Sequence, residues 1–147
     1  MPFVGVHGGS LLGRNAEDYL KSKDSIVAGF QKAVELYNPD GMPVMFDLQV
    51  EAEALGCELA WARNNPPAVV SHPLQGGKKL EELSLPGPDD GRIGMVMEAC
   101  RINAENHPDV ALYGLITGPF TLALHLLGTD IFIKMFEDDA YINELMS

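Results

Sequence analysis

Hydrophobic positions along the chain form short continuous runs that alternate with longer stretches of helical spacing. The short runs cover residues 2–7, 43–46, 57–61 and 109–117, and each predicts a strand. The last run contains no charged residue between Val110 and Ile116, which makes it the clearest prediction of a buried strand. Strands that alternate with helices predict a parallel sheet built from βαβ units.

The stretches between these runs carry helix signals. Asn15 is a plausible N-cap, and apolar residues at helical spacing then predict one helix that ends at Tyr37, before the sequence Asn-Pro-Asp-Gly. A short helix over residues 50–55 is expected to close at Gly56. Further helical segments are expected at residues 78–83, at 91–106, after the 109–117 strand through residue 127, and from there to the last residue.

Composition narrows the classes of function. The chain has 147 residues, a formal net charge of −11 and a sequence pI near 4.6, without a cluster of Lys and Arg, so nucleic-acid binding is not expected. Neither a membrane-spanning run nor a signal sequence is visible. Cys57 and Cys100 lack CxxC or Cys–His spacing, which predicts free thiols and a cytoplasmic location. Residues 1–147 are expected to belong to one domain.

Candidate chemistry gathers where predicted strands end, because ligands bind at the carboxyl ends of parallel strands. Three such ends carry polar or glycine-rich residues: His7 before two glycines, Asp47, and the segment 117–119. Asp47 is also a good N-cap for the helix that follows, and His7 is also a good hydrogen-bonding loop residue. Gly118 and Pro119 suit a rigid turn that lets a substrate approach backbone amides.

Two segments resemble signatures of the uroporphyrinogen decarboxylase superfamily. The first runs from Met45 to Gly56, Met-Phe-Asp-Leu-Gln-Val-Glu-Ala-Glu-Ala-Leu-Gly, and the second from Gly114 to Gly128 contains Gly-Pro-Phe-Thr-Leu-Ala-Leu-His. This resemblance implies a (β/α)8 barrel, of which 147 residues supply a partial one, the N-terminal half, since a whole barrel takes roughly 250 residues. An open barrel edge implies a homo-oligomer or pairing with a complementary chain.

The resemblance also implies residue roles. It makes Asp47 a catalytic carboxylate and places Phe46, Gly118, Pro119 and Phe120 at the substrate, as substrate-binding residues. The remaining implied positions are the catalytic candidate His125, which stands where the decarboxylases have a tyrosine, and two substrate-binding candidates in the first loop, His7 and Arg14.

Two branches of the superfamily are compatible with these residues. Arg14 is a single arginine where the decarboxylases have a pair, and a polyanionic tetrapyrrole needs several bidentate donors. We therefore favour corrinoid-dependent methyl transfer to a thiol in the intact barrel, with a small molecule or a corrinoid protein as substrate. The alternatives are decarboxylation of uroporphyrinogen acetate groups and a truncated, non-catalytic binding fragment.

Zinc and a corrinoid are implied only for the full-length methyltransferase. No metal site and no cofactor are expected within this chain, because its histidines and cysteines lack ligand spacing. The chain by itself is expected to be inactive.

Overall fold

Two short parallel strands make up one sheet of the structure, a computed structural model that describes residues 4–147. Strand β1 (Gly41–Pro43) pairs with β4 (Ala111–Tyr113), and Met42 lies opposite Leu112. The Val44 amide also donates to the Tyr113 carbonyl at 3.1 Å, just beyond the paired residues. The predicted parallel pairing is therefore correct, although β1 begins two residues earlier than the predicted strand at 43–46 and β4 is shorter than the predicted 109–117.

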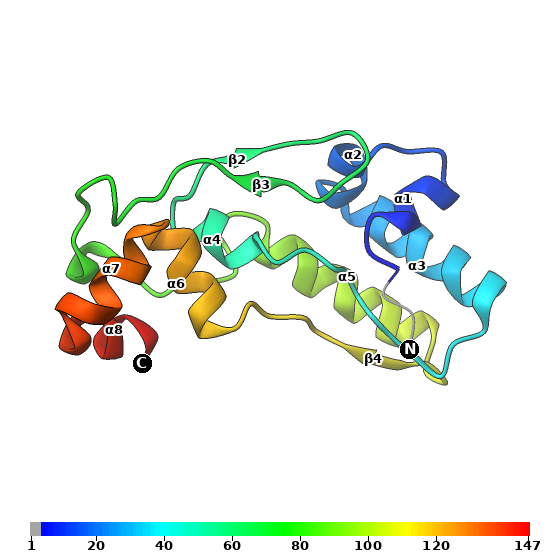
Figure 1. The fold of residues 1–147 in the computed structure, drawn as a ribbon. Coiled ribbons are helices and arrows are strands. Elements are labelled where there is room, and N and C mark those ends of the chain that lie inside the picture. The colour runs from blue at the N-terminus through cyan, green and yellow to red at the C-terminus, as the bar shows by residue number, and fades with distance from the viewer. Residues whose placement is uncertain (1–3) are drawn as a thin grey trace.

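The crossover between these strands carries α4 (Val50–Ala54) and α5 (Ile93–Asn106), and α5 packs beside α3 (Lys23–Tyr37). In Figure 1, α5 runs along the middle of the molecule between the N-terminal helices at one end and the C-terminal helices at the other. Ile26 of α3 and Ala99 of α5 belong to the same hydrophobic cluster as Val44 and Met45, the two residues after β1. This packing gives α3 and α5 the positions of helices that flank a barrel strand.

The strand predicted at residues 2–7 is absent from residues 4–7, the part of it that the structure describes. Residues 1–3 lie outside the described part of the chain, the next residues form a turn, and α1 (His7–Leu11) begins at the histidine. Two glycines give space to a tyrosine side chain: a Cβ at Gly9 of α1 would lie 2.8 Å from the Tyr19 Cβ, and one at Gly29 of α3 would lie 2.6 Å from Tyr19 Cε2. These glycines therefore let Tyr19 of α2 pack against α1 and α3.

The single helix predicted to end at Tyr37 is two helices. Asn15 caps α2 (Ala16–Leu20) as expected, and its side chain accepts from the Asp18 amide at 2.8 Å. Ser22 then adopts an extended backbone and caps α3 by accepting from the Ser25 amide at 3.2 Å. A second capping residue therefore starts a second helix, which ends at the predicted residue.

The proline-rich middle of the chain forms a hairpin and loops. Strands β2 (Leu59–Ala60) and β3 (Ala68–Val69) pair antiparallel, so the predicted strand at 57–61 is a short hairpin strand outside the parallel sheet. A 3-10 turn, η1 (Leu80–Glu82), occupies the predicted helical segment at 78–83. Figure 1 shows the hairpin passing over α4 and α5.

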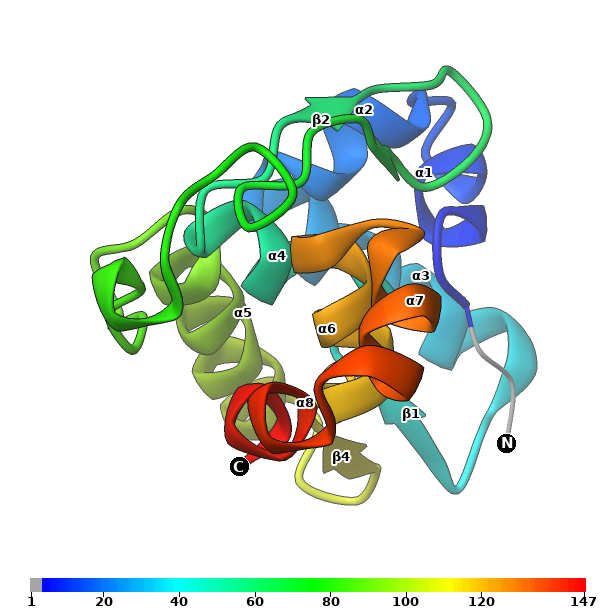
Figure 2. The ribbon, with the colours of Figure 1, turned by 60° about the vertical axis from the view of Figure 1, so that its left-hand side comes forward.

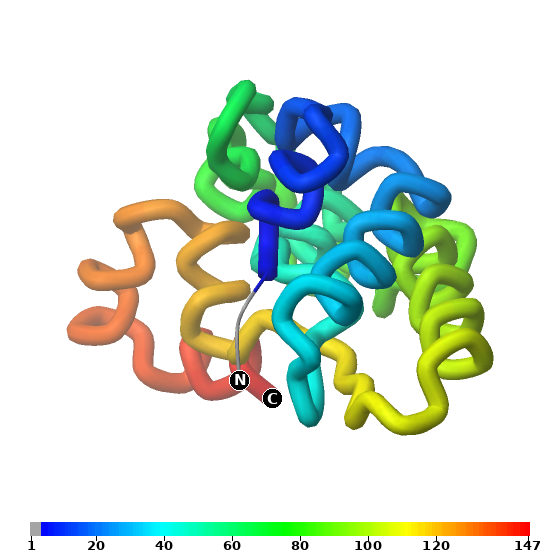
Figure 3. The backbone as a smooth tube through the Cα atoms, turned by 90° about the vertical axis from the view of Figure 1, so that its right-hand side faces the viewer, coloured from blue at the N-terminus to red at the C-terminus, as the bar shows by residue number. Residues whose placement is uncertain are grey.

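Three helices complete the chain: α6 (Pro119–Leu127), α7 (Asp130–Glu137) and α8 (Asp139–Met146). One continuous last helix was predicted, but Asp138 leaves helical geometry and caps α8 by accepting from the Tyr141 amide at 3.1 Å. Figure 2 shows α6, α7 and α8 in front of α3, and in Figure 3 these helices lie to one side of α1–α3. Within residues 4–147 no single helix is long and apolar enough to cross a membrane; α6 and α7 pass that test only together, with a bend of 108°.

The strand predicted at 109–117 was expected to be buried, but it is partly open. Ala111 is exposed, Leu112 and Tyr113 are half-buried, and Ile116 beyond them is 81% exposed. Because β4 pairs only with β1 within the described residues, its second edge has no neighbouring strand. The segment is apolar as a barrel strand is, and a further layer of structure on this side would bury it.

Candidate functional site

A buried ion-pair network anchors the segment after β1. Asp47 is 3% exposed, and its Oδ2 accepts from Arg92 Nη1 at 2.7 Å while its Oδ1 accepts from the Gln49 amide at 2.9 Å. Arg92 Nε donates to Glu53 Oε2 at 2.6 Å, and its Nη1 also reaches the Leu20 carbonyl at 3.3 Å. Both Asp47 oxygens are therefore occupied by partners within the chain, and the carboxylate is neutralised by a guanidinium.

An aromatic ring covers part of this network. The Arg92 guanidinium carbon lies 4.8 Å from the centroid of the Trp61 ring, and Lys21 Nζ lies 4.2 Å from it. Such cation–π contacts keep apolar surface against a charged group and limit water around it. The hairpin residue Trp61 thus joins α2, α5 and the segment after β1.

A second set of hydrogen bonds joins the segments that follow the two parallel strands. Thr117 Oγ1 donates to the Leu48 carbonyl at 2.7 Å and contacts Glu51 Oε2 at 3.1 Å. The Thr117 amide donates to Glu51 Oε1 at 3.1 Å. The carboxyl ends of β1 and β4 are therefore held together by one threonine and one glutamate, as expected for the functional end of a parallel sheet.

His125 on α6 lies next to this bridge and to His72. The His72 Nδ1 donates to the His125 carbonyl at 2.7 Å, and the Cys57 Sγ lies 3.4 Å from the same oxygen. Burial is the main cause that lowers the pKa of His125 below its ordinary 6.5; the neighbouring His72 lowers it further, and Glu51 acts in the opposite direction. The His125 imidazole is therefore uncharged at neutral pH.

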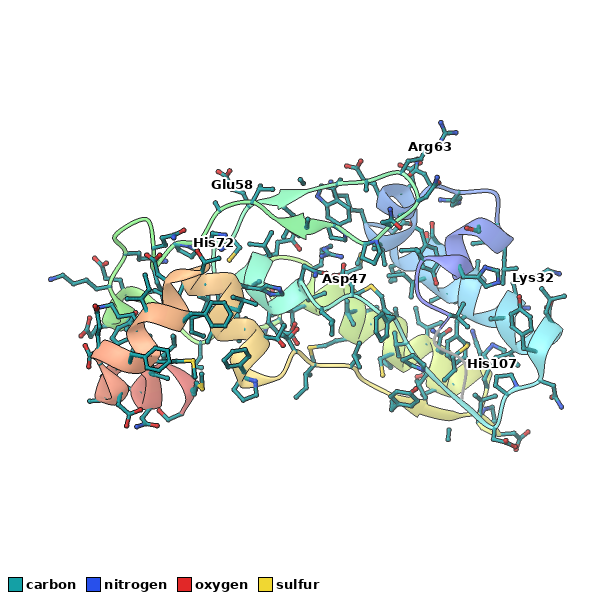
Figure 4. The ribbon with its side chains drawn as sticks, in the orientation of Figure 1. Lys32, Asp47, Glu58, Arg63, His72 and His107 are labelled. Atoms are coloured by element: carbon teal, nitrogen blue, oxygen red, sulfur yellow. The ribbon has the colours of Figure 1, made fainter. Side chains whose placement is uncertain are left out.

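Two cavities of about 380 Å3 each flank these residues. The sheet cavity lies between the strand ends and α5, and its lining is largely apolar but includes Asp47 and Glu51. The hairpin cavity lies beneath residues 67–69 and is lined by the side chains of Gln49, His72 and His125. Asp47 and His125 therefore face different cavities. Figure 4 places Asp47 near the centre of the molecule and His72 toward the α6 end.

The other predicted site residues are spread more widely. His7 is exposed and bonds the Tyr37 hydroxyl at 2.7 Å, and Arg14 Nη1 donates to Ser25 Oγ at 2.7 Å, so the structure brings neither to the other site residues. Half-buried Phe46 lies near the turn that precedes α1, where a Cβ at Gly5 would be 3.6 Å from its own.

The residues that start α6 lie beside the candidate site. Gly118 is the N-cap of α6 and Pro119 its first residue, directly after Thr117. Phe120 is 43% exposed, and its ring centroid lies 6.5 Å from that of Phe132. Gly118 has an extended backbone with ψ 153°, so it and Pro119 connect the segment after β4 directly to α6, and Phe120 is exposed to solvent. A role of this connection in substrate binding stays a prediction.

The zinc implied by the resemblance has no ligand set in the described residues. Within residues 4–147, no group of three or more His, Cys, Asp and Glu side chains is placed to hold a metal ion. Cys57 and Cys100 are both free thiols, as predicted. Because these residues do not fit zinc, no chemical step through a metal ion is derived from them.

The sequence does not identify four residues that take part in the candidate site: Arg92, Glu51, Gln49 and His72. Arg92 stands alone before a helix, where spacing gives no sign that it reaches residue 47. One signal existed: an aspartate expected at the buried end of a strand requires a cationic or hydrogen-bonding partner. That requirement indicates that a partner exists but does not say which of the ten basic residues supplies it.

Parallel strands with flanking helices, and polar residues gathered at the strand ends, define a partial (β/α)8 barrel with its candidate site at the usual face. The chain matches the family described as uroporphyrinogen decarboxylase (URO-D) over residues 8–147, and it belongs to this family.

Relatives and a solved structure support the same assignment. The chain is 29% identical over 109 residues to the methylcobamide:CoM methyltransferase MtbA of Methanosarcina acetivorans, covering 73% of this chain and 32% of that protein. It is 34% identical over 104 residues to MtaA of Methanosarcina barkeri, covering 68% and 30%. A methyltransferase from Methanosarcina mazei superposes with a TM-score of 0.83 at 26% identity, covering 97% of this chain and 43% of that one. The chain thus spans about a third of the curated relatives it matches, and its fold is part of a barrel.

Proposed function

We propose that this chain forms one part of a barrel that transfers a methyl group from a methylated corrinoid to a thiol. The observation that carries the proposal is the state of the arginines: Arg92 is committed to Asp47 and Glu53, and Arg14 is bonded to Ser25. A uroporphyrinogen carries many carboxylates and needs several free bidentate donors. Arg92 and Arg14 are already bonded to groups within the chain, so they do not supply such free donors.

The relatives support the same choice of reaction. Two matched proteins are named methylcobamide:CoM methyltransferases, and another is a methylated-thiol–coenzyme M methyltransferase of Methanosarcina mazei, 29% identical over 99 residues. We infer a methylated corrinoid, free or protein-bound, as donor and a small thiol such as coenzyme M as acceptor. Both would be substrates of the completed barrel.

His125 is the residue we assign to proton transfer. A thiolate, not a thiol, is the nucleophile in methyl transfer. An uncharged imidazole at the mouth of the site accepts the thiol proton, with Glu51 nearby to stabilise the resulting cation. The sulfur then bonds the methyl carbon, and the cobalt–carbon electron pair stays with cobalt. The Asp47–Arg92 pair holds the wall of the site in place.

The test is an activity assay on the assembled barrel. The chain is co-expressed with the complementary barrel segment of the Methanosarcina mazei methyltransferase to which it is similar. Loss of methylcobalamin absorbance with 2-mercaptoethanesulfonate measures methyl transfer, and loss of carboxyl groups from uroporphyrinogen measures the alternative. Methyl transfer that needs both segments supports the proposal.

Other outcomes overturn it. Decarboxylation without methyl transfer would establish the porphyrinogen branch, and a folded, assembled complex that does neither would identify a non-catalytic binding fragment.

The His125→Gln variant tests the role of His125 in proton transfer. Because protonation of His125 removes the base, the wild-type rate falls as pH drops through a value below 6.5. The variant is expected to lose this acid limb, and an unchanged pH profile contradicts the role of His125.

A further inference from the structure

The hairpin cavity contains polar groups but no carboxylate, lysine or arginine among the described residues that line it. Its lining among the described residues includes Gln49, His72, His125 and Thr129, together with apolar side chains, and no Asp, Glu, Lys or Arg. Since the pKa of His125 is lowered, this imidazole adds no positive charge at neutral pH. A carboxylate, sulfonate or phosphate would lose its hydration there without gaining a cationic partner. The cavity therefore suits an uncharged hydrogen-bonding group.

The tautomer of His72 is fixed by its surroundings. A carbonyl oxygen only accepts, so the Nδ1 that lies 2.7 Å from the His125 carbonyl carries the proton. When Nε2 carries no proton, it can accept a hydrogen bond from an N–H or O–H donor. Gly128 leaves room for the ring: its φ is +60°, and a Cβ there would lie 2.9 Å from His72 Cδ2.

Gln49 adds a group that both donates and accepts. Its Oε1 is buried and has no hydrogen-bond partner among residues 4–147, and the same holds for His125 Nδ1. Unpaired buried polar atoms are costly, so each is better satisfied by a ligand than left alone. The terminal torsion of a glutamine is broad, and a rotation about it turns the amide toward the cavity that the residue lines.

An uncharged partner with both an N–H donor and a carbonyl acceptor satisfies these groups together. A primary carboxamide makes a two-bond pair with the Gln49 amide, and its second N–H reaches toward the His72 acceptor. A cavity of about 380 Å3 admits one such arm but not a macrocycle.

We infer that the hairpin cavity of this chain binds a carboxamide side chain of the corrinoid substrate. This inference rests on the proposed function, because it assigns a place to one part of the methyl donor. The edge of a cobamide carries amide arms, whereas the sulfonate of coenzyme M has no lysine or arginine partner in this cavity. The thiol that gives its proton to His125 would therefore approach with its sulfonate outside the cavity. The corrin ring would remain outside, against the mouth of the site.

Equilibrium dialysis with two corrin probes tests the inference on the 147-residue protein itself. Dicyanocobinamide carries the amide arms, and dicyanocobyrinate heptamethyl ester has the same ring with methyl esters, which cannot donate a hydrogen bond. We expect the amide probe to bind at least about five-fold more tightly, the worth of one or two hydrogen bonds. His72→Phe and Gln49→Leu should each remove most of this preference.

The control is His107→Phe, which changes a histidine outside the cavity that contacts Phe30, and which should keep the preference. Ala68→Phe fills the cavity from an exposed position and removes no polar group. It therefore tests the inference if His72→Phe or Gln49→Leu fails to fold. Equal binding of both probes, no binding of either, or a preference that survives in every cavity variant would overturn the inference. The methyl-transfer assay of the assembled barrel is independent of these outcomes, so the two proposals fail separately.

Discussion

Replacing Arg92 by methionine should destabilise the protein strongly, because within residues 4–147 the arginine is the only cation that pairs with buried Asp47. The Arg92 side chain is 9% exposed and that of Asp47 is fully buried. Removal of one partner leaves the other charge without compensation, which typically costs about 3–5 kcal/mol. The bond to Glu53 and the contact with Trp61 are lost as well. We therefore expect a loss at the upper end of that range.

Arg101→Met is a matched control, because Arg101 lies within α5 and Arg92 is the N-cap of the same helix. Arg101 also pairs with two carboxylates, at 2.8 Å to Glu98 and 2.6 Å to Glu105, but its side chain is 56% exposed. Solvent screens such pairs and side-chain entropy opposes them. The two variants thus differ in burial and not in the number or length of ion pairs. Arg101→Met is expected to leave the free energy of unfolding near the wild-type value.

Urea unfolding followed by far-ultraviolet circular dichroism measures both variants; the fluorescence of Trp61 is avoided, because Arg92 contacts the ring. A double variant, Arg92→Met with Asp47→Leu, should be more stable than Arg92→Met alone, since it leaves no unpaired charge at position 47. Equal losses for Arg92→Met and Arg101→Met, or a double variant no more stable than the single one, would refute the reasoning.

Three further predictions concern packing, thiol chemistry and association. Gly29→Ala should cost about 1–3 kcal/mol by driving a Cβ into the buried tyrosine ring, whereas Gly114→Ala, which meets no atom within 4 Å, should be neutral in thermal unfolding. Buried Cys57, whose pKa burial raises to about 11, should react with a thiol reagent far more slowly than half-buried Cys100, and equal rates in single-cysteine variants would contradict this. Sedimentation should show self-association of the chain that Ile116→Lys weakens, and a strictly monomeric wild type would argue against the open edge.

The sequence predicted elements well where local signals decide them. The caps and breakers at Asn15, Tyr37 and Gly56 lie where expected, and the parallel pairing of β1 and β4 is confirmed. The predicted helix boundaries are wrong where a single capping residue interrupts a long stretch of apolar residues at helical spacing. Ser22 and Asp138 each cap a new helix inside a stretch whose apolar spacing continues, and spacing alone does not reveal that choice.

The candidate site was predicted less completely, because its contacts join distant segments. Asp47 and Thr117 were found from their place after strands, and the structure confirms that the segments that follow the two strands meet. Arg92 reaches Asp47 across 45 positions, and His72 reaches the His125 carbonyl across 53. No periodicity in the sequence encodes such pairs; only the folded crossover brings them together. The catalytic roles of Asp47 and His125 themselves remain predictions.

The pairing of Asp47 with Arg92 limits what this carboxylate can do. A carboxylate stabilises a developing cation when its charge is uncompensated and an oxygen faces the reacting group. Here one oxygen accepts from a guanidinium 2.7 Å away and the other from the Gln49 amide. Direct charge stabilisation would require the ion pair to open, at a cost comparable to breaking a buried salt bridge. The strand-end aspartate therefore suits a supporting role, which agrees with the proposal that His125, the uncharged imidazole near Glu51, accepts the proton.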